Sequence, residues 1–239
     1  MGTTRRGGNG RRPAARLFAH DRALGERRVA GTDEAGRGCL AGPLVVAAVC
    51  LDVGGLSHRA RRSLSDLDDS KRLAPDVRAR VAEAILRHAE QVVVLVAGPA
   101  TIDRDGLHRT NLRLLARALA ALEPCPSICL VDGFRLGPHA PEHRAVVGGD
   151  GRGACIAAAS VIAKTARDRL MAGPVANAYP DFGFDQHVGY ATPEHHAALR
   201  AEGLSPVHRR SFQSVAYPSL WAGPPPVTRP WRRPGAPAG

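Results

Sequence analysis

Apolar runs of strand length alternate with amphipathic helix patterns along most of this chain, and this alternation restricts the fold more than any other feature. Residues 43–51 read PLVVAAVCL, a continuous run typical of a strand buried on both faces. Residues 91–97 and 127–131 are two further apolar runs. Pro75 opens a helix pattern between the first two runs, and residues 111–122 repeat that pattern before the third. The order predicts an α/β fold in which helices flank a mixed sheet.

Further elements extend the pattern on both sides. A strand is expected from Val29, and a short one at residues 145–147. Residues 154–171 read as a helix of small residues that suits close packing. A last helix is expected to begin at Thr192, an N-cap residue, and to end at Gly203.

Most of the formal charge of +11 belongs to the two ends of the chain. Residues 1–28 hold eight arginines against two acids, and residues 222–239 hold three arginines and no acid. We expect both ends to be disordered, the first as a basic arm and the second as a Pro/Gly-rich tail, with one folded domain at residues 29–221. Basic arms suit a polyanionic partner, although solubilising tails explain the composition equally well.

Cysteine usage and hydropathy indicate where in the cell the protein is expected. Five cysteines without CxxC spacing fit neither a disulfide framework nor a zinc site, so a reducing, cytoplasmic location is expected. No apolar window approaches the ~18 residues that span a bilayer, and the N-terminus lacks the apolar run of a secretory signal. We expect a monomer that does not bind a membrane.

Carboxylates stand at the ends of predicted strands. Asp33 and Glu34 end the first, and Asp132 ends the run at residues 127–131. Clustered acids are usually partnered by arginine or a hard cation, and a set of oxygen ligands favours Mg²⁺ or Mn²⁺ over zinc. Neighbouring strand residues point to opposite faces, so Asp33 and Glu34 share one site only if the strand ends or bends between them. For a single acid, a turn or cap remains the simpler interpretation.

A series of short motifs resembles one family. Bacterial ribonuclease HII is similar in residues 31–38 (GTDEAGRG), 69–73 (DSKRL), 131–133 (VDG), 149–150 (GD), 157–164 (AAASVIAK), 187–192 (HVGYAT) and 208–212 (HRRSF). The resemblance covers about residues 29–215. It implies an RNase H-like fold with a central mixed five-stranded sheet and a C-terminal helical segment at about residues 175–215.

The resemblance also implies an activity and its residues. It implies cleavage of RNA paired to DNA, including 5′ of single ribonucleotides in duplex DNA, which leaves 3′-hydroxyl and 5′-phosphate ends. Two divalent ions, Mg²⁺ or Mn²⁺, would bind the attacking water and the leaving oxygen. The implied metal-binding and catalytic acids are Asp33, Glu34, Asp132 and Asp150. The implied substrate-binding residues are Gly36, Arg37, Gly38, Ser70, Lys71, Lys164 and Tyr190.

Two of these implied contacts would recognise sugars, and at one position near an implied acid this sequence departs from the family. The resemblance places the Gly36–Gly38 backbone at the ribose 2′-hydroxyl and Tyr190 on the next deoxyribose, so that no base is read. Gly148 stands where the family usually has lysine, which removes a cation near Asp150. The alternatives are a hybrid-only or DNA-processing nuclease of the same fold and a non-catalytic protein that binds nucleic acid through its basic arms.

Overall fold

Five strands form one mixed sheet in the computed structural model, which describes residues 13–212. Their order is β3-β2-β1-β4-β5; β2 is antiparallel to both neighbours, whereas β1, β4 and β5 run parallel. The predicted five-stranded mixed sheet is thus confirmed. The strands are β1 (Arg28–Ala35), β2 (Leu44–Asp52), β3 (Gln91–Ala97), β4 (Ile128–Asp132) and β5 (Arg144–Val146).

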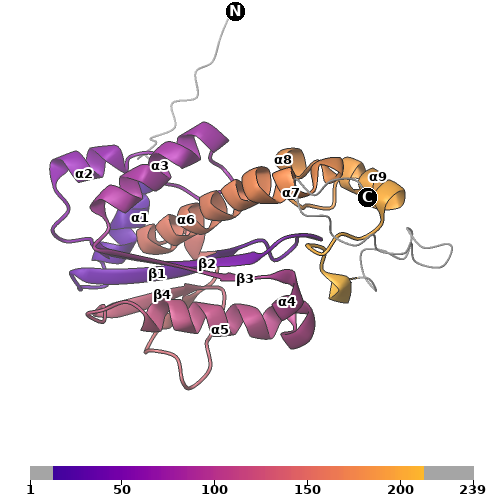
Figure 1. Cartoon of the computed structure of the whole chain (residues 1–239). Coiled ribbons are helices and arrows are strands. Elements are labelled where there is room, and N and C mark those ends of the chain that lie inside the picture. Colours follow the sequence, from indigo (N-terminus) through magenta and orange to yellow (C-terminus); the bar gives the residue numbers. More distant parts are fainter. Residues whose placement is uncertain (1–12, 213–239) are drawn as a thin grey trace, which may run out of the picture.

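Helices cover both faces of the sheet, with α1, α2, α3 and α6 on one face and α4 and α5 on the other (Figure 1). Strand β2 is buried on both faces because its side chains alternate between two apolar cores. Val45 and Ala47 belong to the core under α6, and Val46 and Ala48 belong to the core under α5. The helices are α1 (Pro13–Arg22), α2 (His58–Ser63), α3 (Pro75–His88), α4 (Pro99–Asp105), α5 (Leu107–Ala120) and α6 (Ala154–Leu170).

Helix α6 lies directly on strand β1 because both present small residues at the contact. Its residues Ala157–Ala159 are fully buried, and so is Ala163. A Cβ added at Gly31 would overlap the backbone of Cys155 and Ile156, so only glycine permits this approach. The predicted helix of small residues is confirmed, and the C-terminal part of the chain follows directly from its end.

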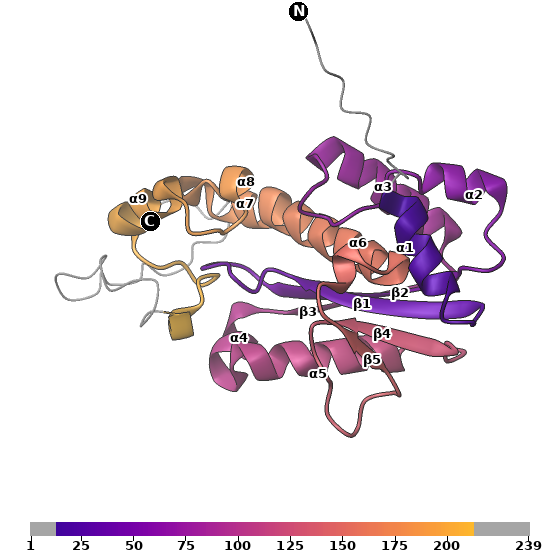
Figure 2. The same ribbon diagram turned by 180° about the vertical axis from the view of Figure 1, so that it is seen from behind.

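The C-terminal segment continues from α6 past the end of the sheet (Figures 1 and 2). Its apolar core joins Phe182, Phe184 and Leu199 to Leu40 and Ala41 from the loop after β1. This segment confirms the predicted C-terminal helical segment. Its elements are η2 (Met171–Val175), α7 (Ala176–Ala178), η3 (Pro180–Phe182), α8 (Phe184–His187), α9 (Pro193–Glu202) and η4 (Arg210–Phe212).

Two fully buried arginines fasten this segment to the loop after β1. The Arg167 guanidinium donates to the carbonyls of Ala41, Pro43 and Val188 at 2.9–3.0 Å. The Arg209 guanidinium donates to the carbonyl of Gly42 at 3.0 Å. Buried guanidinium groups need such partners, and here several backbone carbonyls provide them.

The structure differs from the sequence predictions near the N-terminus. Residues 13–22 form α1, so the expected disordered arm over residues 1–28 is wrong for its second half. Leu17 and Phe18 account for this order, because they are buried in the core under α6. Residues 1–12 and the predicted tail at 222–239 lie outside the described residues. Within residues 13–212, no helix is long and apolar enough to span a bilayer.

Candidate active site

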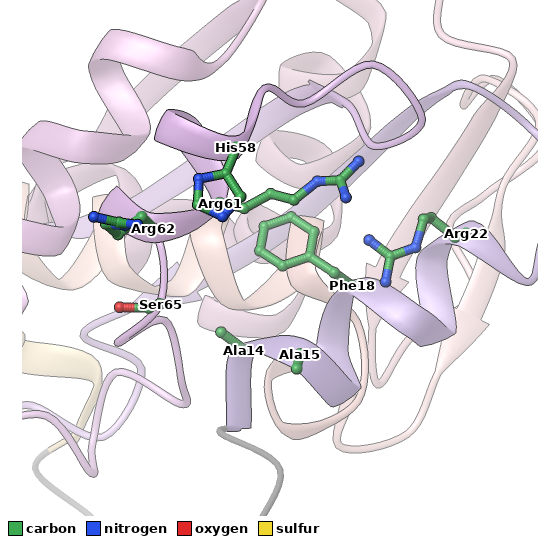
Figure 3. A pocket seen from close by; sticks show the side chains of 8 residues that line it. All are labelled: Ala14, Ala15, Phe18, Arg22, His58, Arg61, Arg62 and Ser65. Atoms are coloured by element: carbon green, nitrogen blue, oxygen red, sulfur yellow. The ribbon is translucent and has the colours of Figure 1, made fainter.

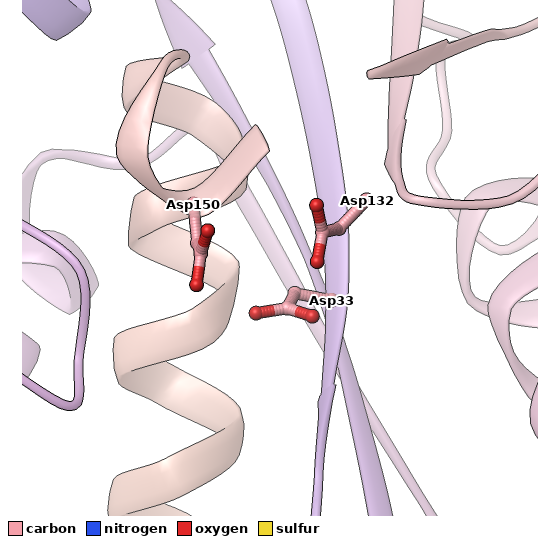
Figure 4. A group of neighbouring side chains, drawn as sticks. All are labelled: Asp33, Asp132 and Asp150. Atoms are coloured by element: carbon pink, nitrogen blue, oxygen red, sulfur yellow. The ribbon is translucent and has the colours of Figure 1, made fainter. Parts of the chain in front are cut away.

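Three aspartates from separate parts of the chain converge at one edge of the sheet (Figure 4). Asp33 lies near the end of β1, Asp132 ends β4, and Asp150 lies in the short turn η1 (Gly149–Gly151). One oxygen of each carboxylate lies within 4.8 Å of the others. Asp33 and Asp150 are buried and Asp132 is half-buried. Such a set of oxygen ligands fits a hard divalent cation.

The sheet register explains why the first two acids meet. Strands β1 and β4 are parallel and pair Thr32 with Val131, so Asp33 and Asp132 follow at the same level on the face under α6. Asp150 arrives through a turn that begins with Gly148 in the left-handed region (φ 62°). The Gly149 backbone N–H donates to Asp132 Oδ1 at 2.7 Å and ties this turn to β4.

Glu34 does not join this set. Strand β1 runs unbroken through Ala35, so Glu34 points to the face opposite Asp33, toward α5. Its Oε1 accepts a hydrogen bond from Arg37 at 3.3 Å, and its Oε2 is buried with no hydrogen-bond partner in residues 13–212. The four predicted acids are therefore found as three clustered aspartates with a glutamate on the other side of the strand.

Burial and the repulsion of neighbouring carboxylates raise the pKa of Asp33, Glu34 and Asp132. The pKa of Asp33 is well above its usual range, first because of burial and then because Glu34 and Asp132 are close. Burial also raises the pKa of Asp132, against the lowering effect of the Gly149 N–H. Burial raises the pKa of Glu34 and outweighs the opposite effect of Arg37. The protein thus holds acids whose ionisation a cation would favour.

Lys71 supplies a cation beside Asp150. Its Nζ lies 3.4 Å from Asp150 Oδ2. Partial burial lowers the pKa of Lys71, but Asp150 and Asp69 outweigh this effect and the pKa is raised overall. The absence of a lysine at position 148 therefore does not leave Asp150 without a positive neighbour.

The turn after β1 contains two glycines with different surroundings. Gly36 has φ +98°, and a Cβ there would overlap the Arg167 side chain. A Cβ added at Gly38 would meet no atom within 4 Å. Arg37, between them, lies with its guanidinium 4.8 Å from the centre of the Phe134 ring. The backbone at Gly38 is therefore open to an incoming ligand.

One cavity of about 280 Å³ brings the predicted residues together. All of the predicted site residues except Asp150 line it, and Asp150 lies beside it in contact with Lys71. Tyr190 is 38% exposed at its rim. The cavity is lined by Asp33, Glu34, Ala35, Gly36, Arg37, Gly38, Ser70, Lys71, Asp132, Ser160, Lys164 and Tyr190.

Lys164 and Ser70 are held by other side chains. Lys164 Nζ lies 2.8 Å from Asp168 Oδ1, the ion pair that their spacing on the helix predicts, and 5.0 Å from the centre of the Tyr190 ring. Ser70 Oγ shares a hydrogen bond of 2.8 Å with Ser160 Oγ. Both predicted substrate contacts therefore reach the cavity from fixed positions.

Two residues of the site gave no functional signal in the sequence. Ser160 lines the cavity but stands within a run of alanines that indicates only close packing. Asn111 is fully buried on α5, where it lies beside Glu34 and lowers the pKa of that carboxyl. Its amide has no partner at hydrogen-bond distance in the described part of the chain. A polar residue at a buried position of an amphipathic helix is the one signal that would have found Asn111.

A larger cavity, of about 410 Å³, lies between α1 and α2 and shares no residue with the acidic one (Figure 3). Arg22, Arg61 and Arg62 surround it, and Phe18 lies between Arg22 and Arg61 (Figure 3). No carboxylate lines it. The chemistry of the three aspartates therefore belongs to the smaller cavity.

Comparison with known proteins gives one family. The family model Ribonuclease HII matches residues 30–215. The chain is 49% identical to the Ribonuclease HII of Mycobacterium avium over 187 residues, which cover 78% of this chain and 79% of that protein. It is 45% identical to the Ribonuclease HII of Salinispora arenicola over 216 residues, or 89% and 78%. Among solved structures, the PCNA:RNase HII complex from Archaeoglobus fulgidus matches with a TM-score of 0.67 and 27% identity, covering 82% of this chain and 98% of that one.

Proposed function

Because this chain belongs to the ribonuclease HII family, and is therefore a type 2 ribonuclease H that acts on RNA–DNA hybrids, we propose that it also cuts duplex DNA 5′ of a single embedded ribonucleotide. The proposed reaction leaves 3′-hydroxyl and 5′-phosphate ends and depends on two divalent ions. The observation that supports it most strongly is the convergence of three carboxylates beside an open glycine turn in one cavity.

The residues present suit divalent ions. Asp33, Asp132 and Asp150 offer only oxygen ligands, and burial disfavours the ionisation of Asp33 and Asp132 unless a positive charge compensates. Glu34 retains a buried oxygen without a partner in residues 13–212, which is available to a ligand at the end of β1. We propose that these four acids hold the ions, with the three aspartates as the central set.

Bound Mg²⁺ or Mn²⁺ would lower the pKa of the attacking water and neutralise the departing 3′-oxygen. The protein's own residues place the substrate. Lys71, exposed at the cavity and beside Asp150, can neutralise a phosphate next to the scissile bond, and Ser70 can donate to it. The proposed chemistry requires no side-chain nucleophile, because a water molecule would attack the phosphorus directly.

Recognition would depend on two neighbouring sugars. The open backbone at Gly38 and the adjacent Arg37 admit a ribose whose 2′-hydroxyl can hydrogen-bond to main-chain groups. Tyr190, at the rim of the same cavity, offers a ring face for the deoxyribose that follows. Neither contact reads a base edge, so cleavage should be independent of sequence.

A duplex that carries one ribonucleotide tests this function. We expect cleavage at its 5′ side with Mg²⁺ or Mn²⁺ and none with EDTA. Indifference to the ribonucleotide, with cleavage of continuous hybrids retained, would favour a hybrid-only enzyme. Binding without cleavage under any metal would favour a non-catalytic role, and removal of residues 1–12 and 222–239 then tests whether the basic ends carry the binding.

A further inference from the structure

Three histidines are buried together in the C-terminal segment, and the proposed cleavage chemistry uses none of them. His187 ends α8, His195 lies in the first turn of α9, and His208 follows α9 in the chain. Their exposed fractions are 7%, 0% and 2%. Buried histidines must have their ring nitrogens satisfied, so their partners determine which nitrogen carries the proton.

The hydrogen bonds fix the protons of two of these rings. The Tyr190 carbonyl can only accept, so His195 Nδ1, at 2.8 Å, must carry a proton and donate. A neutral His195 then has a bare Nε2, which accepts from His208 Nε2–H at 2.9 Å. This leaves His208 Nδ1 bare, where it accepts from the Ser205 N–H at 3.0 Å and from the Ser205 hydroxyl at 2.8 Å. A single directed chain of hydrogen bonds therefore runs from Ser205 to the Tyr190 backbone.

The third histidine, His187, holds the turn at Gly189 and Tyr190 from the side opposite His195. His187 Nε2–H donates to the Phe182 carbonyl at 2.7 Å, and His187 Nδ1 accepts from the Gly189 N–H at 3.2 Å. Its ring stacks on His195 with centroids 4.4 Å apart. The Tyr190 N–H donates to the His187 carbonyl at 2.9 Å. Hydrogen bonds from two histidines thus determine where the Tyr190 backbone lies.

This turn faces the glycine turn of the cavity. The Gly189 carbonyl accepts from the Leu40 N–H at 2.9 Å, which joins it to the loop that follows Gly38. The Tyr190 side chain is 38% exposed at the cavity rim, with the Lys164 ammonium 5.0 Å and the Arg167 guanidinium 5.9 Å from the centre of its ring. The backbone contacts therefore set the distance between the Tyr190 ring and the open backbone at Gly38.

We propose that His195, oriented by His208, is a positioning residue that places Tyr190 for its contact with the deoxyribose 3′ of the ribonucleotide. The inference rests on the proposed function, in which Tyr190 meets that sugar. Selectivity for the junction would then depend on a hydrogen-bond chain that starts at Ser205, fifteen residues away from Tyr190 in the sequence.

The first test reads the protons directly and needs no substrate. Nitrogen-15 NMR of the imidazole rings at pH 7 should show His195 as the Nδ1–H tautomer and His208 and His187 as Nε2–H tautomers. The opposite tautomer at His195 or His208, or a charged ring at either position, would overturn the chain of hydrogen bonds.

The second test uses variants that differ in one donor. His208→Leu removes the donor to His195, whereas His208→Gln keeps an N–H in reach of it, and His196→Gln changes the neighbouring residue of α9 as a control. The readout is the ratio of kcat/KM for a substrate with deoxyribose 3′ of the ribonucleotide to that for a substrate with a second ribose at that position. We expect His208→Leu to lower this ratio about fivefold, the effect of one hydrogen bond, and His208→Gln to restore most of it. If His208→Leu does not fold, His208→Gln must retain the ratio while His195→Leu lowers it.

Tyr190→Ala separates this inference from the proposed function. In the Tyr190→Ala background, the change at His208 should have no further effect on the ratio, because the histidines act through Tyr190. An equal loss in both backgrounds would overturn the positioning role. If Tyr190→Ala alone leaves the ratio unchanged, the proposed sugar contact is wrong, whatever tautomers the histidines show.

Discussion

The Cys155 backbone N–H donates to Asp21 Oδ2 at 2.8 Å, so a carboxylate from α1 caps the first turn of α6 across 134 positions of sequence. Asp21 is fully buried, and its other oxygen lies 2.9 Å from His20 Nδ1. On the same helix, Arg16 donates to the carbonyl of Gly151, next to Asp150 in the sequence, at 3.1 Å. Helix α1 therefore supports the turn that carries one of the three clustered acids.

Asp21→Ala should reduce the free energy of unfolding by about 1–3 kcal/mol, because it removes a helix cap and leaves a buried N–H without a partner. Urea denaturation measures this effect. Arg22→Ala, at an exposed position of the same helix, is the matched control and should change the value by less than about 0.5 kcal/mol. Equal stability of the two variants would show that the cap contributes nothing.

Asp33→Asn should make the metal-free protein more stable at neutral pH. The folded-state pKa of Asp33 is raised, so the free energy of unfolding falls as pH rises from the unfolded pKa through the folded one. Asparagine removes this cost, and the Tm in EDTA should rise by about 2–6 °C, with the difference shrinking toward pH 4. Mn²⁺ should raise the Tm of the unmodified protein more than that of the variant. A lower Tm for Asp33→Asn in EDTA would contradict the electrostatic account.

Asp132→Asn should abolish cleavage while duplex binding is largely retained. The amide keeps the shape of the side chain but loses the negative charge with which the carboxylate would bind a divalent cation. Cleavage of a single-ribonucleotide duplex and a gel-shift titration measure the two effects, and Asp181→Asn, at an exposed position, serves as the control. Activity of Asp132→Asn within about tenfold of the control would exclude Asp132 as an essential ligand.

Gly38→Ala and Gly36→Ala should fail for different reasons. A Cβ at Gly38 would meet no atom of the described chain within 4 Å, so Gly38→Ala should keep its Tm yet lose at least about tenfold in kcat/KM, because the methyl group would occupy the space in which we propose that the substrate sugar binds. At Gly36 the Cβ overlaps Arg167 and φ is +98°, so stability should also fall. Full activity of Gly38→Ala would show that no substrate atom approaches this backbone.

The buried histidines should make stability depend on pH below neutrality. Burial lowers the pKa of His195 to about 4 and that of His208 to about 3, against an ordinary value of 6.5. The unfolded chain takes up protons first as pH falls, so stability is fully present above pH ~6.5 and decreases by about 1.4 kcal/mol per pH unit for each histidine below it. Urea denaturation at pH 7, 6 and 5 should show a flatter dependence for His208→Gln than for His196→Gln. Identical slopes would contradict these low pKa values.

Local patterns in the sequence were sufficient to predict the strands and the longer helices. The run at residues 43–51 indicated a strand buried on both faces, and β2 is such a strand. The helix expected at residues 111–122 begins earlier, as α5, because the cap of α4 at Gly106 also starts the next helix. Helix α1 was not predicted because it is ordered by the burial of Leu17 and Phe18 against residues distant in the sequence. The local composition of residues 13–22 does not indicate that contact.

The site was predictable where it depends on strand register and not where it depends on tertiary contacts. Alternation along a strand already placed Asp33 and Glu34 on opposite faces unless β1 bent between them, and β1 does not bend. The burial of Arg167 had no such signal, since its three carbonyl partners come from two loops far apart in the sequence. Asp21 was assigned to an arm for the same reason: its partner is Cys155.

The guanidinium of Arg167 has a practical consequence for engineering. Because it donates hydrogen bonds both to Ala41 and Pro43 before β2 and to Val188 in the C-terminal segment, it fixes the position of these two stretches relative to each other. In a chimera that takes only its C-terminal helices from a relative, the hydrogen bonds of Arg167 to Ala41, Pro43 and Val188 would not all be kept. A transplant meant to retune the enzyme should therefore exchange residues 36–43 and 167–212 as a single cassette.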